Sequence, residues 1–421
     1  MSPDSCRKIE LPYGKGSLTI SVPVENLLAV VEPRRLPPAP DLMAELRRVL
    51  ANPVGAPRLR EKARGARSVA VVVEDVSRPV PSSLLLDAVM EELEAAGVTT
   101  DKIKVIVATG LHRDLTRKEM DRILGRWKGK LHIENHNAKD PDRLVPLGTT
   151  RLGTEIAVNK TFMQAEFKIL TGDVEYHQFC GYGGGAKCVY PGMASADAIR
   201  MNHSRMDLPG TGPGRIAGNP VREEINEVGR MARVDYNLSV ALDAEHRIVA
   251  ARAGDPDLSF REACRFIDEM YLVEIPGRAD LVIASPGGHP KDLDLYQSQK
   301  AIEEASLDVK PGGSVLVAAR CEEGSGSKTF ERWMDEAYDP EEIVRRIKEK
   351  FIMGGHKAYQ IAREVQRARV YLYSELPPGR VRAWMMHPIR SMEEIDALIA
   401  QADSVLVLPQ ATLTLTRLPN E

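Results

Sequence analysis

The stretch Ser68-Val-Ala-Val-Val-Val-Glu-Asp75 decides the fold class of this chain. An unbroken apolar run of this length, ending in acidic residues, is typical of a strand buried on both faces in a parallel sheet. An amphipathic pattern over residues 84–96 predicts a helix after it, and a second apolar run, Ile103 to Ala108, predicts the next strand. This strand–helix–strand order indicates an α/β protein.

The same alternation extends along most of the sequence. Further strands are predicted at residues 17–22, 166–170, 280–284, 314–318 and 404–408, with a strand pair over residues 238–251. Further helices are predicted at residues 194–201, 221–232 and 295–307. A proline-rich connector over residues 33–40 separates the first strand from the rest.

The length of 421 residues exceeds what one ordinary core supports, so two domains are expected. The strand–helix pattern restarts after Pro276-Gly277, and we predict a boundary near residues 270–278. The fold prediction is therefore two α/β domains with mostly parallel sheets. The first covers residues 1–270 and the second residues 278–408.

The composition excludes several classes of protein. Hydrophobic residues make up 43% of the chain and charged residues 28%, as in water-soluble globular proteins. The net charge of −3 gives no basic field for nucleic acid or an anionic membrane, and no apolar run has the length of a membrane span. The five cysteines show no CxxC spacing, the N-terminus lacks the apolar stretch of a signal peptide, and we expect a cytoplasmic protein.

Polar side chains follow three of the predicted strands. Asp75-Val-Ser-Arg78 follows the first strand, His112 follows the second, and His177 comes shortly after the strand at 166–170. Ligands of doubly wound sheets bind outside the carboxyl ends of the strands. These residues are therefore expected to converge on one crevice.

The segment Glu175-Tyr-His-Gln-Phe-Cys-Gly-Tyr-Gly-Gly-Gly-Ala-Lys187 is rich in glycine, which lets a backbone lie close against a ligand. The phosphate-binding loop Gly-x4-Gly-Lys-Ser/Thr does not fit, since Ala186 and Cys188 replace its second glycine and its hydroxyl. The spacing of Gly181, Gly183 and Ala186 meets the loose dinucleotide fingerprint, but the strand before it is too far away. A lysine at the end of such a loop best fits covalent attachment of a carbonyl-type cofactor.

Other candidate residues have plain alternatives. Asp75 and Ser77 could merely cap the following helix, which leaves Arg78 unexplained, and Gln297 and Lys300 could lie on a solvated helix face. His203 is expected just after the helix at 194–201, where it could cap that helix or bind a metal. His132 and His136 lack the His-Glu-x-x-His pattern and are interpreted as surface or packing residues.

Five segments together resemble the nickel-dependent lactate racemase family of 2-hydroxy acid racemases and epimerases. They are Asp75-Val-Ser-Arg-Pro-Val-Pro81, Ala108-Thr-Gly-Leu-His-Arg113, the glycine-rich segment from Glu175 through Lys187 to Gly192, Asn202-His203, and Tyr296-Gln297-x-x-Lys300. Departures from the family pattern occur at Gln178, Cys180, Gly183 and Cys188.

The resemblance implies nickel held in a pincer nucleotide, the Ni(II) complex of pyridinium-3,5-bisthiocarboxylic acid mononucleotide. By resemblance, Lys187 links covalently to it, His203 binds the nickel, and His112 and His177 are the catalytic acid/base pair. Cofactor contacts are implied for Asp75, Val76, Ser77, Arg78, Gln297 and Lys300, and substrate contacts for Arg78, Tyr296 and Lys300. The family architecture also implies a site in the cleft between the domains and a C-terminal tail, 409–421, that joins the first domain.

Physical chemistry agrees with this activity. Removing the Cα proton of a 2-hydroxy acid would build a dianion, whereas removing the hydrogen as hydride leaves a neutral carbonyl. The hydroxyl proton must leave as well, so each enantiomer needs a base on its own side, and two histidines meet that need. Nickel with sulfur donors and one imidazole suits a planar site. His203 should then bind the metal through one nitrogen while an acceptor holds the other.

The leading hypothesis is thus a racemase or epimerase acting on a small 2-hydroxy acid. An NAD-dependent 2-hydroxy acid dehydrogenase is the second, because the loose dinucleotide fingerprint and hydride chemistry would also fit it. A non-catalytic nucleotide-cofactor-binding protein would need Lys187 and His203 but not both His112 and His177. Other proteins must make and insert the cofactor, so transient contacts with those enzymes are expected, and none with nucleic acid or a membrane.

Overall fold

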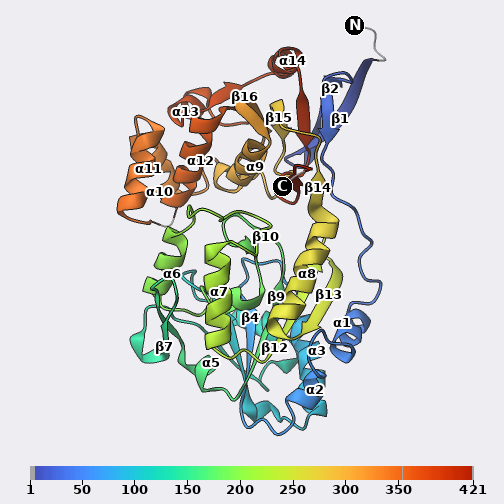
Figure 1. Ribbon diagram of the computed structural model, residues 1–421, viewed down its shortest axis with the longest axis vertical. Helices are drawn as coiled ribbons and strands as arrows, with labels where there is room; N and C mark the ends of the chain where they lie inside the picture. The colour runs from blue at the N-terminus through green and yellow to red at the C-terminus, as the bar shows by residue number, and fades with distance from the viewer. Residues whose placement is uncertain (1–4, 353, 420–421) are drawn as a thin grey trace. The chain divides into compact units, whose positions relative to one another are not determined.

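Two compact α/β units make up the chain. The computed structural model describes residues 5–352 and 354–419. The central unit comprises residues 35–270, and the terminal unit combines residues 1–34 with 271–421. Each is built on its own six-stranded sheet (Figure 1). The predicted fold class, α/β units with mostly parallel sheets, is confirmed.

The sheet of the central unit has the order β13-β12-β9-β4-β5-β6. β4 (Val69–Glu74) lies between β5 (Ile103–Ala108) and β9 (Phe167–Asp173) and runs parallel to both. The remaining strands are β6 (His132–Asn135) and β13 (Ile248–Gly254), which form the two edges, and β12 (Tyr236–Leu242), which lies between β13 and β9. Within this sheet β12 and β13 pair antiparallel.

Both faces of this sheet are covered, which explains the apolar run in β4. Val69, Val71 and Val73 pack on one face, in a cluster with side chains of α1 (Leu42–Ala51) and α3 (Ser82–Ala95). Ala70 and Val72 pack on the other, with residues 188–199 and α7 (Pro220–Met231). Successive side chains of a strand point to opposite faces, so a strand covered on both sides must be apolar throughout.

The other elements of the central unit are shorter or peripheral. The helices are α2 (Leu59–Lys62), α4 (Arg117–Leu124), α5 (Lys160–Gln164), α6 (Ala196–Ser204) and α8 (Pro256–Tyr271). The strand pairs are β7 (Leu144–Thr149) with β8 (Glu155–Asn159), and β10 (Tyr176–His177) with β11 (Gly181–Tyr182). Short 3-10 turns include Gly185–Cys188.

The sheet of the terminal unit has the order β18-β17-β16-β15-β19-β3, and all its pairings are parallel. Its strands are β3 (Leu27–Val30), β15 (Ala279–Ala284), β16 (Val309–Ala318), β17 (Arg369–Tyr373), β18 (His387–Ile389) and β19 (Val405–Leu408). Its helices are α9 (Leu295–Leu307), α10 (Lys328–Glu336), α11 (Pro340–Glu349), α12 (Gly355–Arg367), α13 (Pro378–Ala383) and α14 (Met392–Ala400).

The N-terminal residues group with the C-terminal half, which differs from the expected first domain of residues 1–270. The strands β1 (Cys6–Tyr13) and β2 (Gly16–Pro23) form a hairpin whose buried side chains share a core with α14, β15 and β16. β3 then pairs with β19. The sheet and the core of the terminal unit are complete only when this segment is present, which a local sequence pattern does not reveal.

The C-terminal tail also differs from the expected arrangement, in which residues 409–421 would join the first domain. β20 (Leu415–Arg417) pairs parallel with β14 (Leu272–Glu274), and both strands belong to the terminal unit. The Ala411 amide donates to the Ser285 carbonyl at the end of β15. Backbone hydrogen bonds therefore hold the described part of the tail within its own unit.

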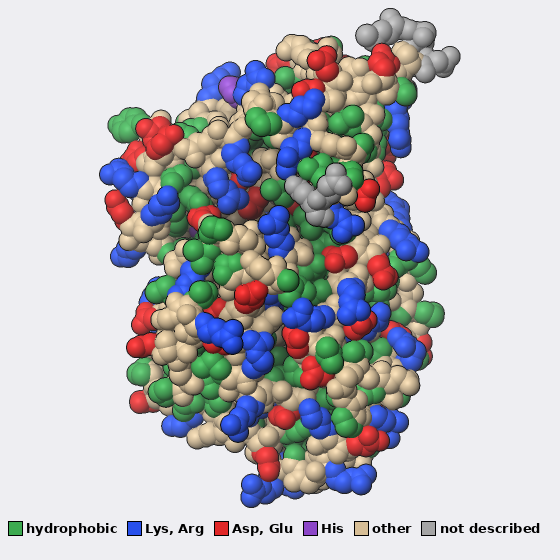
Figure 2. Space-filling model, viewed as in Figure 1, with side chains coloured by type: hydrophobic (Ala, Val, Ile, Leu, Met, Phe, Trp, Pro, Cys, Tyr) green, Lys and Arg blue, Asp and Glu red, His purple; other side chains and the backbone are tan. Residues whose placement is uncertain are grey.

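The surface carries a mixture of charges. Figure 2 shows Lys and Arg side chains interspersed with Asp and Glu on the face in view. No helix among residues 5–352 and 354–419 is both long enough and apolar enough to cross a bilayer.

The buried hairpin allows a test of the unit boundaries. Leu11 is fully buried in the core shared with α14, so Leu11→Ala should lower the free energy of unfolding of the terminal unit by about 2–5 kcal/mol. Urea unfolding followed by tryptophan fluorescence in a Trp127→Phe background reports on this unit, because the two remaining tryptophans, Trp333 and Trp384, both lie in it. Leu28→Ala is the control, since Leu28 is 36% exposed, and its effect should stay within about 0.5 kcal/mol. An unchanged tryptophan transition in Leu11→Ala would contradict this grouping.

Candidate functional site

Most of the predicted site residues follow the carboxyl ends of strands of the central sheet. Asp75, Val76, Ser77 and Arg78 follow β4, and His112 follows β5. His177, Lys187 and His203 lie in the segment that follows β9, on β10, in the 3-10 turn Gly185–Cys188 and on α6. The contacts described next show which of these residues lie close together.

Asp75 and His112 form a hydrogen-bonded pair. His112 Nδ1 lies 2.9 Å from Asp75 Oδ2, and the Ser77 amide donates to Asp75 Oδ1 at 2.6 Å. Burial alone would raise the pKa of Asp75, but the hydrogen bonds from His112 and Ser77 outweigh it and lower the pKa to about 2. Since a carboxylate only accepts, Nδ1 carries the hydrogen, and in neutral His112 the lone pair is on Nε2.

The turn that carries His112 is fixed from both sides. The His112 amide donates to the Thr109 carbonyl, and the Gly110 amide donates to the Gly192 carbonyl at 2.9 Å. Thr109 is buried and its hydroxyl donates to the His136 carbonyl. The His112 side chain is 53% exposed, so its imidazole is accessible from solvent while its backbone is held.

Arg78 is surrounded by carboxylates. Its Nη1 pairs with Glu175 Oε1 at 2.5 Å. The charge of Glu175, followed by those of Glu74 and Asp173, raises the pKa of Arg78 above its usual value. Burial raises the pKa of both Glu74 and Asp173, and the Asp173 amide donates to Glu74 Oε2.

The glycines of the segment before Lys187 make room for the protein's own backbone. A Cβ on Gly181 would lie 2.0 Å from the Arg215 carbonyl oxygen, and a Cβ on Gly184 would lie 2.2 Å from the Asp173 carbonyl oxygen. Both glycines have positive φ, at 80° and 75°. These contacts, rather than approach to a ligand, account for glycine at these two positions.

A buried arginine holds this glycine-rich segment. Arg222 on α7 is fully buried, its Nε donates to the Cys180 carbonyl at 2.9 Å, and its Nη2 donates to the Tyr182 carbonyl. Its guanidinium also lies over the Phe260 ring, 4.7 Å from the centroid. The loop that carries His177 and Lys187 is therefore attached to α7 by a cation.

Lys187 lies in an environment that favours the neutral amine. Burial is the main cause that lowers its pKa, and the positive charge of Arg78 adds to the effect. A neutral amine is the nucleophilic form of lysine, which covalent attachment requires. The glycine-rich segment contains the two short strands β10 and β11 and does not form a tight strand–turn–helix unit. It therefore lacks the context of a dinucleotide-binding loop, as expected from the sequence.

Phe179 lies between two of the predicted histidines. Its ring centroid is 4.7 Å from that of His177 and 5.5 Å from that of His203, both at steep angles. Burial, followed by the charge of Lys187, lowers the pKa of His177 well below the usual value. The environment of His177 therefore favours its neutral imidazole.

His203 lies inside the last turn of α6, not after the helix as the sequence pattern predicted, because α6 begins at Ala196 and ends at Ser204 instead of spanning residues 194–201. Its Nδ1 donates to the Ile199 carbonyl at 2.9 Å, so the lone pair of the neutral ring is on Nε2. Burial lowers its pKa to about 4. The expected acceptor for the second nitrogen is therefore a backbone carbonyl of the same helix.

The other predicted residues lie on the first turns of α9 in the terminal unit. Gln297 and Lys300 are exposed, and Tyr296 is half-buried against Phe330 and His356 at ring distances of 6.4 and 6.2 Å. Asp294 caps the helix by accepting from the Gln297 amide.

Lys357 on α12 lies beside these residues and was missed by the sequence patterns. It is only 5% exposed, its Nζ donates to Gln299 Oε1 at 2.9 Å, and it lies 5.9 Å from the centroid of Tyr296. Burial, followed by the charge of Lys300, lowers its pKa to about 7. Nothing in the local sequence marks it, because the contact joins two distant helices.

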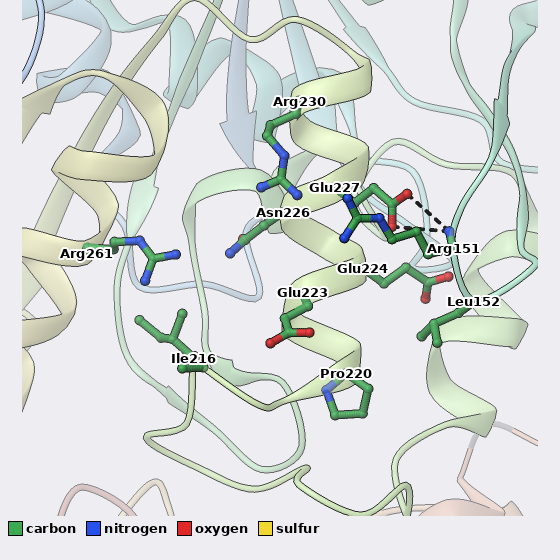
Figure 3. A pocket seen from close by; sticks show the side chains of 11 residues that line it. Arg151, Leu152, Ile216, Pro220, Glu223, Glu224, Asn226, Glu227, Arg230 and Arg261 are labelled. Atoms are coloured by element: carbon green, nitrogen blue, oxygen red, sulfur yellow. Dashed lines mark hydrogen bonds between the residues drawn. The ribbon is translucent and has the colours of Figure 1, made fainter.

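A surface pocket of the central unit contains none of these residues. It is lined by side chains of α7 and α8 and by residues 151–152 and 216–217 (Figure 3). Its arginines are accompanied by acidic residues of α7, and Glu227 accepts from the Arg151 amide. The charges compensate one another, and no nucleophile or histidine lines it.

His132 and His136 are interpreted correctly as surface and packing residues. His132 is exposed on β6, and His136 is 1% exposed with its Nε2 2.9 Å from the Ala194 carbonyl. Within the described residues, no group of three or more His, Cys, Asp or Glu side chains could hold a metal ion.

Known proteins share this architecture along nearly the whole chain. The model of the lactate racemase N-terminal domain matches residues 13–211, and that of the lactate racemase C-terminal domain matches residues 275–414. Lactate racemase of Thermoanaerobacterium thermosaccharolyticum is 31% identical over 80% of both chains. That of Lactiplantibacillus plantarum is 28% identical over 95% of this chain and 97% of the relative.

Solved structures agree with these matches. The lactate racemase apoprotein of T. thermosaccharolyticum superposes with a TM-score of 0.89 at 28% identity, covering 98% of this chain and all of that one. A Thermotoga maritima protein with 18% identity and a TM-score of 0.63 shares the fold, over 90% of this chain and 99% of its own. The protein is thus an isomerase of the racemase class. It belongs to the lactate racemase family.

The packing of the glycine-rich segment can be tested with two alanines. Gly184→Ala places a Cβ against the Asp173 carbonyl, whereas Gly153→Ala has the same sign of φ, at 80°, but meets no atom within 4 Å. Both variants carry a backbone cost of about 1–3 kcal/mol, and at Gly184 the extended ψ of −176° places it toward the upper end of that range. Only Gly184→Ala should speed hydrogen–deuterium exchange over residues 175–192. Equal exchange in the two variants would show that the close approach is unimportant.

Proposed function

We propose that the protein inverts the C2 stereocentre of a 2-hydroxy acid, lactate or a relative of it, using a nickel pincer nucleotide attached to Lys187. The observation that carries the proposal is the gathering of His112, His177, Lys187 and His203 around one edge of the central sheet. Membership of the lactate racemase family supports the reaction class.

The donor groups of the central unit fit such a cofactor. Within residues 5–352 and 354–419 the side chains offer no cluster that could hold a metal alone. His203 offers one imidazole nitrogen, with the ring oriented by the Ile199 carbonyl. A single protein ligand suits a metal whose other ligands belong to a bound organic group. Lys187, with its lowered pKa, suits covalent attachment of that group.

When bound, the cofactor supplies a reversible acceptor for the C2 hydrogen as hydride. The histidines of this chain handle the hydroxyl proton. Nε2 of His112 accepts it in one direction, and the Asp75 carboxylate at 2.9 Å stabilises the positive ring that results. His177 serves the opposite face and gives a proton to the carbonyl oxygen of the 2-oxo acid as the hydrogen returns to C2, which forms the other enantiomer.

The remaining residues bind and orient. Arg78 and Lys300 are the cations that would hold the substrate carboxylate, and Tyr296 would contact the substrate as well. Asp75, Val76, Ser77 and Gln297 would contact the cofactor. Enzymes that make and insert the cofactor remain expected partners.

Attachment and metal binding can be separated by two variants. Protein produced together with the cofactor-synthesis enzymes should carry a mass adduct on the peptide that contains Lys187, together with nickel. Lys187→Arg should lose the adduct. His203→Ala should keep the adduct and lose most of the nickel, because its Nε2 is the proposed ligand. An unmodified lysine in active enzyme, or full nickel occupancy in His203→Ala, would contradict these assignments.

The acid/base roles are tested by kinetics. His112→Ala and His177→Ala should each keep the cofactor and lose roughly 10²–10⁴-fold or more in rate, in both directions, because every turnover uses one as base and the other as acid. A chiral assay across 2-hydroxy acids measures this and identifies the substrate.

Isotopes distinguish the mechanisms. The hydrogen at C2 should be retained in the product when the reaction is run in heavy water. Rapid wash-in of solvent deuterium would indicate proton abstraction instead, and dependence on added NAD would favour a dehydrogenase. Full activity after loss of either histidine would favour a protein that only binds the cofactor.

A further inference from the structure

Arg78, the proposed ligand of the substrate carboxylate, already has a carboxylate partner in this chain. Its Nη1 lies 2.5 Å from Glu175 Oε1. The side chains of Arg78 and Glu175 are 32% and 43% exposed, so this ion pair lies where a small molecule can reach it. A second carboxylate that binds Arg78 must therefore share the guanidinium with Glu175 or displace it.

Other acidic residues also lie near Arg78. Glu74, Asp173 and Asp75 all act electrostatically on Arg78. Among these, Asp75 pairs with His112, and Glu74 and Asp173 are held against each other. Burial favours the neutral forms of Glu74 and Asp173, so the carboxylate of Glu175, which pairs directly with Arg78, is the negative charge that an approaching anion meets at the guanidinium.

The backbone of Glu175 is held in place, while its side chain makes one ion pair. The Gly183 amide donates to the Glu175 carbonyl at 2.8 Å, and β10 begins at the next residue. A Cβ on Gly183 would lie 3.2 Å from Glu175 Cγ, so glycine there leaves space for this side chain. The fixed backbone therefore holds the Glu175 carboxylate against Arg78.

We propose that Glu175 is a specificity-determining residue that occupies Arg78 in place of a substrate carboxylate, so that substrate binds in competition with it. This inference rests on the proposed function, because it assigns the substrate carboxylate to Arg78. It implies that only ligands making further contacts, such as those of a 2-hydroxy or 2-oxo group, bind well, while simple anions are excluded. Exposed ion pairs of this kind correspond to a roughly two- to fivefold change in affinity.

The decisive variant is Glu175→Gln, which keeps the size of the side chain and an oxygen acceptor but removes the charge. In the holoenzyme, KM for the 2-hydroxy acid should fall roughly two- to fivefold, with a smaller change in kcat. Calorimetric titration of the same holoenzyme with pyruvate, a small 2-oxo acid, should show a matching fall in Kd. Inorganic phosphate and chloride should inhibit Glu175→Gln more strongly than the unmodified enzyme.

Two comparisons tie the effect to Arg78. Glu262→Gln removes the charge of another ion pair of the central unit, with Arg265 on α8, and should leave KM and Kd unchanged. In an Arg78→Gln background, Glu175→Gln should no longer tighten pyruvate binding, because no cation remains to be released. A gain that persists without Arg78 would overturn the proposal.

Other results of these measurements would overturn either the role of Glu175 or the proposed function. An unchanged or raised KM and Kd in Glu175→Gln would show that Glu175 orients Arg78 for substrate, and would overturn the competition. If the holoenzyme racemises no 2-hydroxy acid, the proposed function fails. The comparison of pyruvate Kd between Glu175→Gln and the unmodified protein still tests whether Glu175 competes for Arg78. Absence of pyruvate binding in both proteins would overturn the assignment of a carboxylate to Arg78.

Discussion

The guanidinium of Arg222 is the interaction on which the candidate site depends most. A fully buried cation is costly unless its donors are satisfied. Here two carbonyls of the glycine-rich segment accept from Nε and Nη2 and Phe260 covers the face of the guanidinium, while Nη1 has no hydrogen-bond partner among the described residues. The guanidinium keeps these hydrogen bonds only while the loop holds this conformation, so the buried charge favours that one conformation of the loop. Since that loop carries His177 at one end and Lys187 at the other, the two groups are positioned together rather than independently.

Local patterns predicted the parts of the fold that depend on local chemistry. The helix at residues 295–307 and the strand at 103–108 have the predicted bounds, because each is a continuous run with clear ends. The place of β3 beside β19 could not be predicted, since the pairing joins residues separated by most of the chain. Parallel pairing leaves no turn signal in the sequence.

The candidate site likewise combines residues marked by local patterns with contacts that only the folded structure shows. Strand ends marked His112 and His177 as candidates, and the glycine-rich segment and the family resemblance marked Lys187 and His203. They did not show that Glu175 would face Arg78, because an ion pair between two loops has no periodicity. The glycines were expected to let the backbone approach a ligand, but Gly181 and Gly184 approach the protein backbone at Arg215 and Asp173, which only tertiary packing reveals.

The order of elements along the chain has a consequence for synthesis. The central unit interrupts the terminal unit, whose strand β3 ends at Val30 and whose partner strand β19 begins at Val405. At about 5–20 residues per second, a ribosome needs roughly 20–75 s to make the chain between them. During that time the edges of β3 and the apolar face of the β1–β2 hairpin have no native partner, although the central unit can already fold. Such a nascent segment is a natural substrate for a chaperone that binds extended apolar chain.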